Sequence, residues 1–422
     1  MRTMSRRTVT ALVLTLSAAT LARAQEPPAP PTPPAAPAPA PAAPPAAPAG
    51  DTAASLAAAK DAFKKGSCPE ALEASLKILE AQAANLEALY IAGACERQLS
   101  KLPEAQGHLR ALLQASPQFP LAHFQLGYVL FLEAEEAART GQVEPAKAKY
   151  AEAAEEFSRE LARNATHAGS LSSRAIALSR AGKLEDAVPA HEAWIAAAPQ
   201  KNDPLVSLAA TYAAAGKSTE AMAALDRLPD KSEKAALDAT LATANTFILK
   251  RDWGAAIPFL EKAAEASPTS TRARALLAQA AARAGLADDA ARHLQALLAM
   301  DPTPEEAEAV GEAIKASFGD GTTAPPRPGV QLPVAVRIPP PRYPKGQDTS
   351  VQTDVLVFAL VKPDALVGAT VMVPNRIWKD IRTTGFEEMA FEAVKRGKFA
   401  PGTKDGQPAE LWIVVPVKFT RS

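Results

Sequence analysis

Aromatic residues and cysteines are scarce in this sequence. Phe, Trp and Tyr make up 5% of its 422 residues, and only two cysteines occur. A single large aromatic core is therefore disfavoured, and the many alanines favour contacts between small side chains on packed helices. The length allows two or three domains. We expect a mainly α fold.

Sequence patterns of catalytic and metal sites are also missing. The chain has no HExxH, GxGxxG, P-loop or GxSxG motif. The histidines are scattered, and we expect them on the surface or in a groove rather than on a metal: His108, His123, His167, His191 and His293. We therefore predict that the protein is not an enzyme and that it holds no metal and no cofactor.

The one long apolar stretch lies close to the N-terminus. A positively charged start precedes a mostly apolar run at residues 8–21, and Ala22-Arg23-Ala24 supplies the small residues of a cleavage site. This run is shorter than the roughly 17–25 residues that span a bilayer. We predict that residues 1–24 are a cleaved signal peptide and that the protein is exported to the periplasm or cell envelope of a Gram-negative bacterium. A retained anchor is the alternative.

The formal net charge is zero, but the charges are unevenly distributed. The chain from Pro325 to its end has 14 basic and 9 acidic residues, whereas residues 25–324 have 28 basic and 37 acidic residues. A basic tail beside an acidic body indicates a tail that faces a partner. Nucleic acid is not the expected partner, because aromatic residues do not alternate with the basic ones.

A proline-rich segment follows the predicted signal peptide. Residues 27–48 contain only proline, alanine and one threonine. Such a segment favours the extended polyproline II conformation, with about 3.1 Å per residue and roughly 70 Å in total. We predict that residues 25–50 form a disordered spacer.

Between residues 51 and 318 the sequence repeats. An alanine recurs about every 34 residues, at Ala71, Ala105, Ala187, Ala221, Ala256 and Ala290, and a proline follows four of these alanines twelve residues later, at Pro117, Pro199, Pro268 and Pro302. A period of 34 residues with two helices per unit resembles the tetratricopeptide repeat. We expect about seven units that stack as a superhelix, with residues 304–318 as a capping helix.

One interval departs from this period. Ala105 and Ala187 are 82 residues apart, which is 14 more than two periods, and the excess lies around residues 133–157. We predict lengthened helices on both sides of Gly141.

The repeat register brings the two cysteines near each other. Cys68 lies in the turn before the second helix of the first unit, and Cys95 lies late in the first helix of the second unit. In an exported protein, such a pair is consistent with a disulfide. Two buried free thiols are the alternative.

A second proline-rich stretch, residues 319–342, is predicted to be a linker. After it the pattern changes: residues 351–361, 365–373 and 410–419 are predicted strands, and residues 385–399 a predicted helix. The resulting order is β-β-α-β. Because the last strand contains a proline, we expect it to lie at a sheet edge or to be bulged.

Residues 343–422 resemble the C-terminal domain of TonB-type energy transducers. The resemblance rests on the order of these elements and on Tyr343, Pro344, Phe399, Pro401, Gly406 and Pro416. It implies a small α+β domain that binds a receptor segment by adding it as a strand to its sheet. The candidate contact residues on the last strand are Leu411, Ile413, Val415, Val417 and Phe419. Their side chains could instead be core, in which case the contact would be made by the backbone.

Together these resemblances predict a non-catalytic, exported scaffold for protein–protein interactions. The repeat groove would hold a protein or peptide, and the C-terminal sheet would bind a second segment. Outer-membrane receptors and other envelope proteins are the expected partners. The alternative is a TonB-type energy transducer, which requires an uncleaved N-terminal anchor. TonB transducers place their spacer directly before the terminal domain, whereas here the repeats lie between the two.

Overall fold

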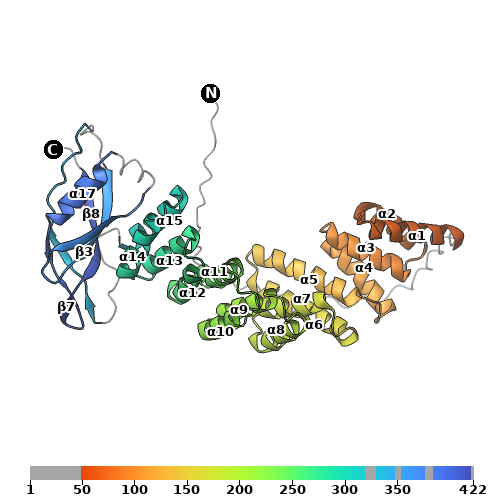
Figure 1. The fold of residues 1–422 in the computed structure, drawn as a ribbon. Helices are drawn as coiled ribbons and strands as arrows, with labels where there is room; N and C mark the ends of the chain where they lie inside the picture. The colour runs from red at the N-terminus through yellow and green to blue at the C-terminus, as the bar shows by residue number, and fades with distance from the viewer. Residues whose placement is uncertain (1–48, 319–328, 347–352, 376–383, 420–422) are drawn as a thin grey trace, which may run out of the picture. The chain divides into compact units, whose positions relative to one another are not determined.

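The computed structural model describes residues 49–318, 329–346, 353–375 and 384–419 (Figure 1). The chain divides into one unit at residues 1–46 and a second at residues 47–422, and every described residue belongs to the second. The predicted signal peptide lies outside the described residues, as does the spacer up to residue 48. Cleavage and export therefore remain predictions.

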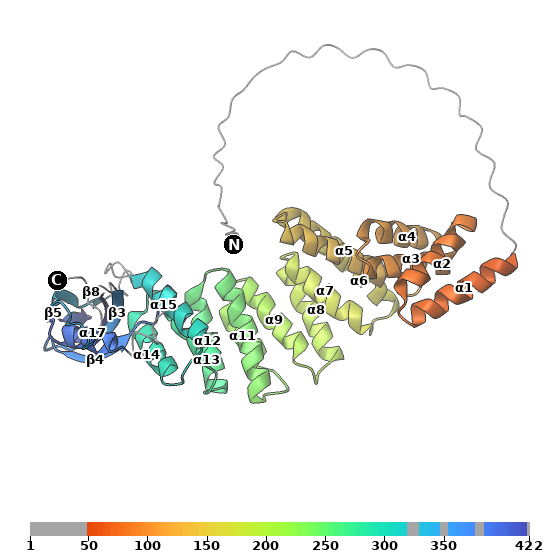
Figure 2. The same cartoon turned by 90° about the horizontal axis from the view of Figure 1, so that it is seen from above.

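Helices form pairs along residues 49–298. Figure 2 shows successive helices lying side by side. Each pair joins two antiparallel helices through a short turn, and a single helix, α15, follows the last pair. The bounds are α1 Ala49–Lys64, α2 Cys68–Ala81, α3 Leu86–Gln98, α4 Leu102–Ala115, α5 Ala122–Arg139, α6 Val143–Arg163, α7 Ala168–Arg180, α8 Leu184–Ala197, α9 Asp203–Ala214, α10 Ser218–Asp226, α11 Glu233–Leu249, α12 Trp253–Ala266, α13 Thr271–Arg283, α14 Ala287–Leu298 and α15 Pro304–Phe318.

Small residues allow the helices of a pair to approach closely. All six alanines of the 34-residue series have no exposed surface, as predicted from their spacing. In the second pair Gly93 has the same role, because a Cβ built on it would lie 2.6 Å from Leu109 Cγ. The prolines also lie as predicted: Pro117, for example, follows two residues after the end of α4.

The turn within each pair contains a residue in the left-handed conformation. Five of the seven are glycines, such as Gly182 with φ 76° and Gly216 with φ 76°. Ser100 and Arg251 adopt the same conformation in the second and sixth pairs, with φ 60° and 59°. A left-handed residue ends a helix without leaving its last carbonyls unpaired.

The third pair has the predicted longer helices: α5 has 18 residues and α6 has 21.

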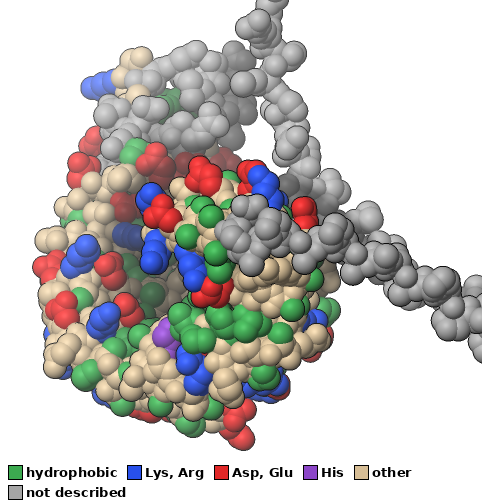
Figure 3. Space-filling view, turned by 90° about the vertical axis from the view of Figure 1, so that its right-hand side faces the viewer, with side chains coloured by type: hydrophobic (Ala, Val, Ile, Leu, Met, Phe, Trp, Pro, Cys, Tyr) green, Lys and Arg blue, Asp and Glu red, His purple; other side chains and the backbone are tan. Residues whose placement is uncertain are grey.

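The first pair has charged side chains on its exposed surface. Lys77 forms an ion pair with Glu73 within α2, and Lys65, which follows the end of α1, forms one with Asp61. In Figure 3, which views the molecule from the side of α1–α4, acidic and basic side chains surround a band of hydrophobic ones. Exposed charges of this kind favour solubility at the end of a repeat stack.

The C-terminal region contains small antiparallel sheets and one described helix, α17 at Phe386–Lys395. The central sheet has the strand order β4-β3-β8, in which β3 pairs with β8 from Thr353↔Phe419 to Val361↔Leu411. Two smaller sheets have the orders β1-β6-β7 and β2-β5. The strands are β1 Val330–Gln331, β2 Val334–Arg337, β3 Thr353–Val361, β4 Val367–Met372, β5 Lys398–Ala400, β6 Gly402–Lys404, β7 Gln407–Ala409 and β8 Leu411–Phe419.

Two predictions for this region need correction. The predicted helix at residues 385–399 ends at Lys395, because residues 398–400 leave it as β5 to pair with β2. The predicted linker at residues 319–342 includes two strands of the C-terminal sheets, since β1 and β2 lie within it and pair with β6 and β5. Membership of the TonB family remains a prediction.

Helices cover both faces of the central sheet. On one face, α17 packs Ala390, Ala393 and Val394 against alternate residues of β3 and β8. On the other face, Phe358 and Trp412 join a cluster with residues of α13, α14 and α15. The last repeat and the sheet therefore share one apolar core. Gly311 of α15 permits this contact, because a Cβ at that position would overlap the carbonyl oxygen of Pro374.

Replacing Gly311 by alanine tests this shared core. We expect Gly311→Ala to lower the free energy of unfolding by about 2 kcal/mol. The added methyl group would overlap the backbone of Pro374, and backbone cannot move aside as easily as a flexible side chain. Urea unfolding followed by circular dichroism measures the change. Gly107→Ala is the matched control: Gly107 lies in α4 with no atom near a built Cβ, so the extra methyl should raise stability by about 0.5–1 kcal/mol. Equal behaviour of the two variants would contradict the close approach.

Candidate functional site

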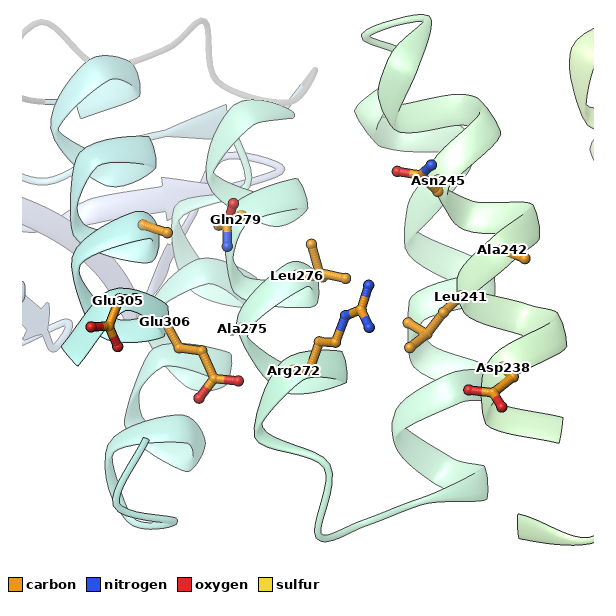
Figure 4. Close-up of a pocket in the computed structure, with 11 residues that line it drawn as sticks. Asp238, Leu241, Ala242, Asn245, Arg272, Ala275, Leu276, Gln279, Glu305 and Glu306 are labelled. Atoms are coloured by element: carbon orange, nitrogen blue, oxygen red, sulfur yellow. The ribbon is translucent and has the colours of Figure 1, made fainter. Parts of the chain in front are cut away.

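A groove lies between the first helices of the last two pairs and the single helix α15 that follows them. It has a cavity of about 530 Å³ between α11, α13 and α15. Its lining combines apolar, amide and charged side chains (Figure 4): Asp238, Leu241, Ala242, Asn245, Arg272, Ala275, Leu276, Gln279, Glu305, Glu306 and Ala309.

The charges of this groove fall into two groups. Glu306 is used by the fold: it accepts the Thr303 backbone N–H at 3.1 Å in a capping box for α15, and the Thr271 hydroxyl at 3.0 Å. Asp238, Arg272 and Glu305 take part in no salt bridge with any of the residues that the structure describes. Figure 4 shows the Arg272 guanidinium between α13 and α11, beside Leu276. An apolar floor with unpaired charges around it suits a peptide segment.

A second candidate surface is aromatic and lies on α3 and α5. Phe124, Tyr128 and Phe131 are half-buried and share one face of α5 at spacings of four and three residues. The Arg97 guanidinium lies 4.9 Å from the centre of the Tyr128 ring, and Arg97 Nε donates to Gln125 at 2.9 Å. Tyrosine and arginine are enriched among residues that dominate binding. The F-x-x-x-Y-x-x-F spacing from Phe124 to Phe131 is the sequence signal for this surface, and the low overall aromatic content does not reveal it.

The five predicted contact residues of β8 lie in the core. Leu411, Ile413, Val415, Val417 and Phe419 are between 1% and 5% exposed. Side chains alternate along a strand, and this set faces inward, four of its members packing with α17. These five side chains are therefore core, which is the alternative that the sequence left open. A contact with a partner through the backbone of β8 remains a prediction.

The β8 strand lies at an edge of its sheet, as its proline predicted. The Trp412 backbone N–H points away from β3 and donates to Asp288 Oδ1 of α14 at 2.8 Å. Alternate residues of an antiparallel strand point their backbone groups the same way, so Val414, Pro416 and Lys418 also face outward. Pro416 fits there because no N–H is needed toward β3. The outward edge of β8 is thus capped at Trp412 and lacks a donor at Pro416.

The residues that carried the resemblance to TonB have structural roles. The Tyr343 ring contacts Phe386 and Phe419, with centroids 6.1 and 5.8 Å apart. Phe399 is buried in the same core. Gly406, with φ 79°, lies in the turn between β6 and β7. Pro344 is buried, whereas Pro401 and Pro416 are exposed.

The cysteines and two histidines are buried within the repeats. Cys68 and Cys95 are free thiols, and the disulfide remains a prediction. His191 and His293 are buried rather than at the surface or in a groove. The His191 Nε2 lies 3.0 Å from Thr211 Oγ1, and burial lowers the pKa of His191 to about 4. Among the described residues, no group of three or more His, Cys, Asp and Glu side chains could hold a metal ion. Within the same residues, no helix has the length and apolar character of a membrane span.

Comparison with known proteins identifies the repeats. Residues 56–120 and residues 247–313 each match a family model described as tetratricopeptide repeat. No curated protein matches the chain.

The solved structures that are similar to this chain include the following three proteins. "YrrB: a TPR protein with an unusual peptide-binding site" is 20% identical, with a TM-score of 0.36 over 41% of this chain and 82% of that chain. MamA 41-end from Desulfovibrio magneticus RS-1 is 16% identical, with a TM-score of 0.36 over 42% and 92% of the two chains. A tetratricopeptide repeat protein from Parabacteroides merdae ATCC 43184 is 16% identical, with a TM-score of 0.38 over 63% and 98%.

The cap on β8 can be removed by replacing Asp288. We expect Asp288→Ala to lower the free energy of unfolding by about 1.5 kcal/mol, because Trp412 loses a hydrogen bond to a charged acceptor. Hydrogen exchange of the β8 peptide, measured by mass spectrometry, should become faster. Asp288→Asn is the control, since its amide oxygen can still accept the bond. Unchanged exchange in the alanine variant would mean that Asp288 does not protect this edge.

Proposed function

Because the chain is a tetratricopeptide repeat protein, we propose that it is a non-catalytic scaffold for protein–protein interactions. The groove between α11, α13 and α15 is the proposed primary site, and an extended peptide segment of another protein is the proposed ligand. The observation that carries the proposal is the apolar floor at Leu241 and Leu276 beside three charged side chains that form no ion pair with any described residue.

The groove offers each type of contact that a peptide needs. Leu241, Ala275 and Leu276 can bury an apolar side chain, which stabilises the bound state by removing its surface from water. Asn245 and Gln279 can exchange hydrogen bonds with a peptide backbone. Asp238 and Glu305, on helices either side of Arg272, can select the charges that flank the bound segment.

Site-specific crosslinking tests the groove. A photoreactive benzophenone amino acid at Gln279 should crosslink to a partner in cells, whereas the same amino acid at Gln295, exposed on the second helix of that pair, should not. Arg272→Glu should weaken the crosslink about tenfold by reversing the central charge. Equal crosslinking from both positions, or from neither, would contradict the proposed site.

A second proposed mode is strand addition to the C-terminal sheet, which the resemblance to TonB implies. On β8 an added strand would pair with the outward backbone groups of Val414 and Lys418, because Asp288 holds the Trp412 N–H and Pro416 has none. The aromatic surface on α3 and α5 is a further candidate contact for a large partner. Export to the periplasm or cell envelope is part of this proposal.

The alternative function is energy transduction to outer-membrane receptors. It requires the N-terminal apolar run to remain uncut as an anchor. Mass spectrometry of the native N-terminus in fractionated cells separates the two functions. We expect a chain that begins at Gln25 in the soluble periplasmic fraction. A chain that retains Met1 in the inner membrane would overturn this expectation and favour the transducer.

A further inference from the structure

The two cysteines of the chain connect the first helix pair to the second. Cys68 is the first residue of α2, and Cys95 lies in the last turn of α3. We propose that they form a redox-modifiable site, at which exchange with a disulfide of a small molecule or an oxidoreductase joins the two pairs covalently and locks the end of the repeat stack. This proposal is independent of the partner-binding groove.

The geometry places the two sulfurs against the same face of α3. Both side chains belong to one buried cluster, together with Ala71 and Ile91. The Cys68 thiol donates to Gln98 Oε1 at 2.9 Å. Gln98 follows Cys95 by three residues and therefore lies on the same side of the helix. Burial, together with the neighbouring Cys68 thiol, raises the pKa of Cys95.

The position in the stack explains how buried thiols could react. In a repeat stack, each pair is stabilised mainly by its neighbours. Within the described residues the first pair packs against a following neighbour, α3, and against no preceding pair, so it is expected to open more readily than the pairs between two neighbours. Opening of α1 and α2 exposes Cys68 at the start of α2.

Two exchange steps complete the reaction. The deprotonated Cys68 sulfur attacks the disulfide donor, forms a mixed disulfide and releases one donor thiolate, which takes up a proton. The deprotonated Cys95 sulfur then attacks the Cys68 sulfur, forms the Cys68–Cys95 bond and releases the second donor thiolate. The two cysteines lose two electrons and two protons, and the donor disulfide is reduced to two thiols.

Gln98 favours the reduced state. Its hydrogen bond requires the Cys68 S–H, which the disulfide lacks. Replacing Gln98 by leucine should therefore shift the thiol–disulfide equilibrium about fivefold toward the disulfide, the effect of losing one ordinary hydrogen bond. Gln106→Leu serves as a control, because Gln106 lies on α4 and its amide faces Glu133 instead.

The test uses the purified protein without its predicted signal peptide, equilibrated in reduced or oxidised glutathione. Alkylation after rapid denaturation, followed by mass spectrometry, counts the free thiols. We expect two free thiols in the reduced sample, none in the oxidised one and no disulfide-linked dimer on a non-reducing gel. Hydrogen exchange of α1 and α2 should slow at least several-fold on oxidation, while α13 and α14 remain unchanged.

Several results would overturn the proposal. These are two free thiols in the oxidised sample, a glutathione adduct without an internal bond, a dimer, or identical exchange of α1 and α2 in both samples. Cys95→Ala should abolish the difference in exchange between the two conditions. If that variant does not fold, the comparison of oxidised with reduced wild-type protein still decides the outcome.

Discussion

The close approach of helices at small residues is the contact on which the rest of this structure depends. An alanine without exposed surface recurs in six of the helix pairs, and glycine at position 93 admits the Leu109 side chain. This spacing lets each pair bury its apolar stripe against the next pair. Burial of many small contacts replaces the single aromatic core that the composition cannot supply. A larger side chain at any of these positions would separate two helices and disturb both neighbouring interfaces.

The helix that follows the last repeat pair, α15, contributes to both the groove and the core of the C-terminal sheet. One side of it contributes Glu305, Glu306 and Ala309 to the groove. Another side buries Val310, Ile314 and Phe318 in the cluster that includes Phe358 of the sheet. The capping box at Thr303 and Glu306 fixes where this helix begins. A ligand in the groove would therefore contact a helix that also supports the C-terminal sheet.

Much of the fold could be predicted from the sequence because its signals are local and periodic. The spacing of alanines predicted the contacts within helix pairs, and the alternation of β-branched residues predicted β3, β4 and β8. The candidate sites were harder to predict, because they depend on which face of an element is covered. The five residues of β8 have the same apolar character whether they face a partner or α17. Likewise, no local signal placed Asp288 at Trp412, since the two are 124 residues apart and meet only through packing.

The shared core between α15 and the sheet has a consequence for modularity. A repeat stack normally ends in a helix with a polar outer side, which makes it soluble without its neighbours. Here the apolar side of α15 is covered by β3, β4 and β8 instead. The proline-rich stretch after Phe318 thus separates two segments of sequence but not two independent folding units. Recombination or truncation at that stretch would leave each half with an uncovered apolar surface, so the two halves are expected to be inherited together.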